Sequence, residues 1–95
     1  MHAPVIASEA ALVPYNDMVI DFTQFPQRMQ DYYAAQGERA ESNLKRHMAK
    51  ITEIDNAVGA LMAKLQETRK LNNTCILFTS DNGPEWYGIA ASYIT

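Results

Sequence analysis

A repeat of apolar residues at intervals of three and four constrains the fold of this chain more than any other feature. The repeat consists of Leu44, Met48, Ile51, Ile54, Val58, Leu61 and Leu65. This spacing places all of them on one face of an α-helix. Glu38 and Glu41 near the start, and Lys64 and Lys70 near the end, suit the helix macrodipole. The sequence therefore predicts a long amphipathic helix over residues 38–71.

Gly59 lies inside this predicted helix. Glycine in a helix interior costs about 1 kcal/mol relative to alanine. We therefore expect a neighbouring element to pack closely against the helix at this position.

The residues before the helix show no comparable period. Residues 1–37 contain Pro4 and Pro14, and they predict a loop-rich lead-in. A short helix is expected near its end, because Pro26 suits a first helical turn and Gly37 interrupts the chain afterwards.

An apolar run, TCILFTS, follows the helix at residues 74–80 and contains neither glycine nor proline. Such a run after a long helix predicts a buried strand of an α/β sheet, in which Cys75 is a small buried hydrophobe. A buried strand needs neighbours on both edges, and this sequence offers at most one other short candidate. The chain is therefore expected to be part of a larger α/β protein, with residues 81–95 forming a turn and tail.

Asp81, Asn82 and Gly83 come directly after the predicted strand. Functional groups collect at the carboxyl ends of strands in open α/β sheets. Ca²⁺ takes oxygen ligands at about 2.3–2.6 Å, and a carboxylate and an amide supply two of them. Asn-Gly is also a common turn dipeptide. The residues alone leave both interpretations open, a metal site or a tight turn.

Charge and hydropathy exclude two classes of partner. The net charge of −3 gives no basic surface for nucleic acid. No stretch approaches the ~20 apolar residues of a membrane-spanning helix, so no transmembrane segment is expected. The single cysteine forms no internal disulfide, and the N-terminus lacks a basic signal-peptide region, so the compartment stays open.

Two stretches together resemble a segment of the sulfatases, enzymes of the alkaline-phosphatase-like superfamily. They are ITEIDNAVGALMAKL at residues 51–65 and NTCILFTSDNGPEW at residues 73–86. The first matches the family in Ile54-Asp55, Val58-Gly59, Leu61 and Leu65, and the second matches over residues 73–84. The resemblance covers residues 47–86.

The resemblance implies an α/β/α sandwich, of which residues 1–95 would be part. It implies hydrolysis of a sulfate ester by a formylglycine nucleophile with the assistance of Ca²⁺. Asp81 and Asn82 match the family's calcium ligands, and an asparagine at the second position favours sulfatases over related phosphodiesterases. His2 and Pro4 match a His-x-Pro pattern whose histidine contacts the substrate sulfate.

The sequence also departs from the family. It contains no Cys/Ser-x-Pro-Ser-Arg motif, and Cys75 is not in such a context. The N-terminal acidic pair of the calcium site and the lysine downstream of Asp-Asn-Gly are missing too. The resemblance therefore implies a sulfatase fragment that does not turn over substrate by itself. The alternative is a non-catalytic helical interaction module or a sulfatase-derived remnant, and the oligomeric state is open in both cases.

Overall fold

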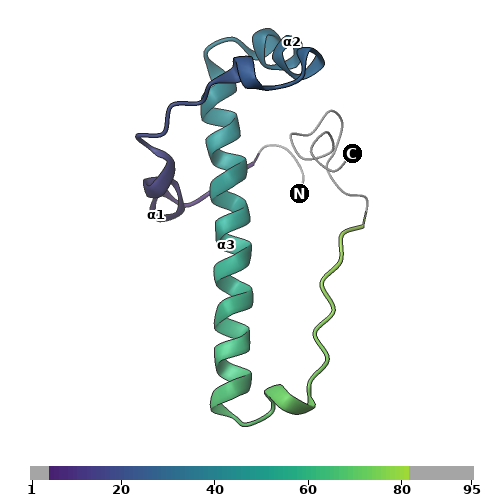
Figure 1. Ribbon diagram of the computed structural model, residues 1–95. Coiled ribbons are helices and arrows are strands. Elements are labelled where there is room, and N and C mark those ends of the chain that lie inside the picture. The colour runs from purple at the N-terminus through teal and green to yellow at the C-terminus, as the bar shows by residue number, and fades with distance from the viewer. Residues whose placement is uncertain (1–4, 82–95) are drawn as a thin grey trace.

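The computed structural model describes residues 5–81, which form helices and connecting segments. Helix α1 spans Glu9–Leu12, α2 spans Gln27–Gln36 and α3 spans Arg39–Glu67. Short 3₁₀ turns lie at η1 (Val13–Tyr15), η2 (Phe22–Gln24) and η3 (Leu71–Asn73). Helix α3 is the longest element; α2 lies at its N-terminal end, and α1 contacts its side (Figure 1).

The molecule is elongated because α3 sets its length. The 29 residues of α3 span about 43 Å at 1.5 Å per residue, close to the longest extent of 49 Å. The radius of gyration is 16.4 Å, against about 12 Å for a compact chain of this size. Much of α3 therefore lies outside any packed core of the described residues.

The core lies at the N-terminal end of α3. Met29 and Tyr33 of α2 are buried against Ala40 and Leu44 of α3. Partly buried residues surround this cluster: Ile20, Phe22, Phe25 and Met48. The ring centroids of Phe22 and Tyr33 are 4.9 Å apart, and those of Phe25 and Tyr33 are 5.7 Å apart, in tilted arrangements favoured by aromatic pairs.

Gly37 makes the connection between α2 and α3 possible. Its φ of 59° and ψ of −135° are strained for a residue with a Cβ atom. Its N–H donates to the carbonyl of Ala34 at 3.1 Å, and its own carbonyl accepts from Ala40 N–H at 3.1 Å. One glycine thus ends α2 and begins the first turn of α3.

Helix α3 ends in a Schellman motif built on an arginine. Arg69 has a φ of 58°, and its N–H donates to the carbonyl of Gln66 at 3.0 Å. Lys70 N–H reaches back to the carbonyl of Leu65 at 2.8 Å. This pair of bonds satisfies the last carbonyls of the helix. Glycine is the usual residue at the left-handed position, and residues 66–70 contain no glycine to signal the end of the helix.

The predicted α/β fold with a buried strand at residues 74–80 is wrong for the described chain. Residues 5–81 contain helices and no strand. The apolar run is extended but exposed: Leu77 is 87% exposed and Phe78 76%, and Cys75 is exposed as well. An extended segment becomes a strand only when a neighbour pairs with its backbone N–H and C=O groups. No other extended segment of residues 5–81 forms a ladder with it.

Most of the C-terminal half of α3 is also exposed. Leu44 and Met48 of the apolar repeat belong to the core or pack against it, whereas Ile51, Ile54 and Leu61 are exposed. A Cβ atom at Gly59 would meet no atom within 4 Å, so the close packing expected there is not seen among the described residues. None of the helices described is long and apolar enough to cross a membrane.

Candidate metal ligand and N-terminal clamp

Asp81 is the one predicted site residue that the structure describes. It is exposed and lies in a bend at the end of the extended segment that follows η3. His2 and Asn82 lie outside the described residues. The structure therefore does not test whether these three residues come together.

Residues 5–81 do not assemble a complete cation site. Within them, no group of three or more histidine, cysteine or acidic side chains is placed to hold a metal ion. Ca²⁺ takes six to eight oxygen ligands, and Asp81 with Asn82 can supply only part of such a set. Any calcium site that includes this pair needs ligands from outside the described segment.

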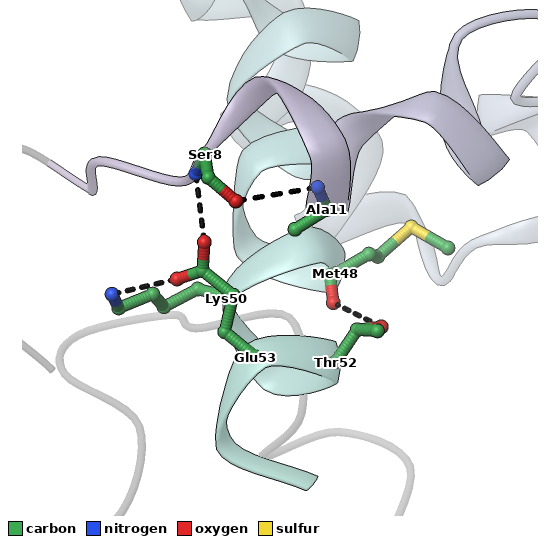
Figure 2. A network of polar contacts seen from close by, with 6 residues as sticks. All are labelled: Ser8, Ala11, Met48, Lys50, Thr52 and Glu53. Carbon is green, nitrogen blue, oxygen red and sulfur yellow. Dashed lines mark hydrogen bonds and ion pairs between the residues drawn. The ribbon is translucent and has the colours of Figure 1, made fainter. Parts of the chain in front are cut away.

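The best-defined polar arrangement ties the N-terminal part of the chain to the middle of α3. The backbone N–H of Ser8 donates to Oε1 of Glu53 at 2.8 Å, and Nζ of Lys50 donates to Oε2 of the same carboxylate at 2.8 Å. The Ser8 hydroxyl accepts from Ala11 N–H at 3.3 Å and so caps α1 (Figure 2). The bond between Ser8 and Glu53 directly joins two residues that are 45 positions apart in the sequence.

Two further contacts extend this arrangement along α3. The hydroxyls of Tyr15 and Thr52 are 2.6 Å apart, and the Thr52 hydroxyl donates to the carbonyl of Met48 at 3.2 Å. Because Thr52 has one hydroxyl proton, Tyr15 is the donor in their shared bond. Lys45 Nζ donates to the carbonyl of Asn16 at 3.0 Å. We call the contacts of Ser8, Tyr15 and Asn16 with Glu53, Thr52 and Lys45 the N-terminal clamp.

Hydrogen bonds hold Glu53 in its charged form. The bond from Lys50, followed by those from Ser8, lowers the pKa of this carboxyl group from 4.5 to about 2. A carboxyl group with a depressed pKa in the folded state contributes stability above its unfolded pKa. That contribution is lost as the pH falls through the folded pKa.

The clamp therefore predicts a defined pH dependence. The difference in unfolding free energy between the wild type and Glu53→Gln should be full above about pH 4.5 and should shrink as the pH falls toward 2. Urea unfolding of both proteins, followed by circular dichroism between pH 2 and pH 6, measures this difference. A difference that stays constant across this range would show that the charge of Glu53 does not act in folding.

His47 is a second titratable group on α3 with an unusual environment. Its Nδ1 atom is buried and has no hydrogen-bond partner among residues 5–81. Desolvation lowers the pKa of the imidazole. Burial of His47 thus disfavours its charged form, and its Nδ1 atom makes no hydrogen bond to any of residues 5–81.

Comparison with known proteins identifies the family. The Sulfatase family model matches residues 16–93. The chain is 39% identical over 64 residues to the N-acetylgalactosamine-6-sulfatase of Canis lupus familiaris. This alignment covers 67% of the chain and 11% of the relative, so the chain spans only a small part of that protein's length. No solved structure matches the chain.

The family match includes all of α2 and α3, the extended segment and Asp81-Asn82-Gly83. It extends past both ends of the segment whose residues resemble sulfatases, residues 47–86. The resemblance inferred from the sequence is confirmed: this chain belongs to the sulfatase family.

Proposed function

We propose that this chain carries part of the metal site of a sulfate ester hydrolase, with Asp81 and Asn82 as two oxygen ligands of Ca²⁺. The observation that carries the proposal is the Thr-Ser-Asp-Asn-Gly sequence at residues 79–83, which lies inside the family match. Members of the family generally use a metal ion. The exposure of Asp81 is compatible with this role, because its carboxylate is accessible at the end of the extended segment.

The residues of this chain account for only part of the chemistry. A bound calcium ion would neutralise negative charge on the sulfate group. Asp81 would supply a charged ligand and Asn82 a neutral one, while His2 would donate a hydrogen bond to a sulfate oxygen. The Cys/Ser-x-Pro-Ser-Arg nucleophile motif is not in this sequence, so the 95 residues are not expected to hydrolyse a sulfate ester by themselves.

Calcium titration of the chain tests the proposed ligands. We expect Ca²⁺ above about 1 mM to shift the backbone amide signals of Asp81 and Asn82, because a partial ligand set binds more weakly than a complete site. Asp81→Ala should abolish this response. The measurement is a series of ¹⁵N–¹H spectra at constant ionic strength.

Asp55→Ala is the matched control, because Asp55 is also an exposed aspartate but lies within α3. Its substitution should leave the response at Asp81 and Asn82 unchanged. Shifts at Asp81 and Asn82 no larger than those at Asp55 would indicate general screening of charge by the cation. That result would refute the assignment of the two residues as ligands.

One observation favours a second candidate function, a helical interaction module. The exposed apolar side chains of α3 include Ile51, Ile54, Leu61 and Met62, with exposures from 39% to 60%. Such a module would be monodisperse in solution and would show no calcium response at Asp81 and Asn82. Sedimentation velocity together with the titration above separates the two candidates.

A further inference from the structure

We propose that residues 74–80 are an interaction surface for a second copy of this chain, and that the two copies pair there as an antiparallel two-stranded ribbon. The segment is an exposed, extended run between η3 and Asp81 (Figure 1). It is rich in apolar residues and carries no charge, proline or glycine. Exposed segments of this composition pair readily with other chains.

The backbone of the segment offers one edge with free hydrogen-bond donors. Among residues 5–81, the N–H groups of Cys75, Leu77 and Thr79 have no acceptor. In an extended chain, alternate residues direct their N–H groups to the same edge, as an antiparallel ladder requires. Thr74 belongs to the opposite edge, and its N–H already donates to the carbonyl of Leu71 at 3.2 Å. The edge of residues 75, 77 and 79 is therefore the one available for pairing.

The choice of this edge determines which side chains meet. When Leu77 lies opposite Leu77 of the second copy, Cys75 lies opposite Thr79, and these residues form the hydrogen-bonded pairs. Ile76 then lies opposite Phe78 of the second copy in a non-hydrogen-bonded pair, where side chains are closest. Contacts between an aromatic and a β-branched residue stabilise such pairs, and this contact occurs twice. It covers side chains that are 43% (Ile76) and 76% (Phe78) exposed in the single chain.

Charge selects the antiparallel direction. In this register Asp81 lies opposite Asn73 of the second copy, and Lys70 is one 3₁₀ turn, about 6 Å, from Asn73. The Lys70 ammonium group can therefore reach the Asp81 carboxylate at both ends of the ribbon. Both side chains are exposed and have no ion-pair partner among the described residues. A parallel pairing in register would instead place Asp81 beside Asp81 and Lys70 beside Lys70.

Sedimentation velocity in the presence of EDTA tests the pairing. Between about 10 μM and about 1 mM protein we expect a reversible equilibrium of monomer and dimer, because a two-stranded ribbon is only marginally stable by itself. Phe78→Lys should raise the dissociation constant about tenfold, since it removes both contacts with Ile76.

Leu61→Lys is the matched control, because it also places a lysine at an exposed apolar residue, on α3. It should leave the dissociation constant unchanged. A chain that stays monomeric over the whole concentration range would overturn the proposal. Equal weakening by Phe78→Lys and Leu61→Lys would do so as well, because the interface would then not be specific to residues 74–80.

Oxidation of paired cysteines tests the direction and the register. In the wild type the two Cys75 residues are offset by four positions, about 13 Å along the ribbon, too far for a disulfide. Thr79→Cys adds a thiol opposite Cys75 of the second copy, with Cα atoms about 5.5 Å apart. We expect this variant to form a covalent dimer linked from Cys75 to position 79, identified by mass spectrometry of its peptides.

Ser80→Cys is the control for random collision of thiols, because residue 80 lies on the other face of the ribbon from Cys75. It should cross-link no more than the wild type. A dimer linked through the two Cys75 residues in the wild type would indicate a parallel pairing, and it would refute the antiparallel arrangement, as would equal cross-linking of both variants. Neither experiment contains calcium, so the assignment of Asp81 and Asn82 as ligands is decided separately by the calcium titration.

Discussion

Replacing Leu44 by alanine is expected to lower the free energy of unfolding by about 2–3 kcal/mol. Leu44 is 4% exposed and lies in the cluster with Met29, Tyr33 and Ala40. Its truncation removes buried methyl groups and leaves a cavity between α2 and α3. Small domains are only marginally stable, so a loss of this size removes a large part of the total. Urea unfolding monitored by circular dichroism gives the value.

Leu61→Ala is the matched control, because it makes the same substitution on the same helix. Leu61 is 53% exposed, and its truncation should change the unfolding free energy by less than about 0.5 kcal/mol. The difference in helix propensity between leucine and alanine is shared by both variants and cancels. Equal losses at the two positions would contradict the placement of the core at the N-terminal end of α3.

The second large effect is expected at the two described glycines, with opposite signs. Gly37→Ala should destabilise the chain by about 1–3 kcal/mol, because alanine at a φ of 59° and a ψ of −135° is strained. Gly59→Ala should stabilise it by about 0.5–1 kcal/mol, because alanine is the better helix former and nothing lies within 4 Å of the new Cβ atom.

These two variants share the chemical change and differ only in backbone conformation. Thermal and urea unfolding of both, compared with the wild type, measure the sign directly. A neutral effect of Gly37→Ala would contradict the left-handed connection between α2 and α3. A destabilising effect of Gly59→Ala would show that another element packs against α3 at this position after all.

The helices were more predictable than their ends. The apolar repeat at intervals of three and four predicted a helix over residues 38–71, and α3 spans Arg39–Glu67 within that range. Its C-terminus was not predictable, because an arginine occupies the left-handed position that glycine usually marks. The attachment of α1 to α3 was not predictable either, because the acceptor of the Ser8 N–H is Glu53, which lies 45 residues from Ser8 along the chain.

The apolar run of residues 74–80 shows why strands are harder to predict than helices. A helix satisfies its backbone within its own sequence, whereas a strand depends on a partner elsewhere. The composition of the run favoured a buried strand, yet Ile76, Leu77 and Phe78 are exposed among the described residues. The site has the same dependence: Asp81 and Asn82 stay a prediction from the sequence, because residues 5–81 bring together no group of three or more histidine, cysteine or acidic side chains that could hold a metal ion.

The central claim is that Asp81 and Asn82 belong to the metal site of a sulfate ester hydrolase. Sequencing the DNA on both sides of the coding region tests it most directly. The account predicts that the reading frame encodes a Cys/Ser-x-Pro-Ser-Arg motif upstream of residue 1 and a lysine-bearing segment downstream of residue 95. A natural start codon at Met1 together with a stop codon after Thr95 would contradict it, because the protein would then lack the nucleophile motif that the resemblance to sulfatases implies.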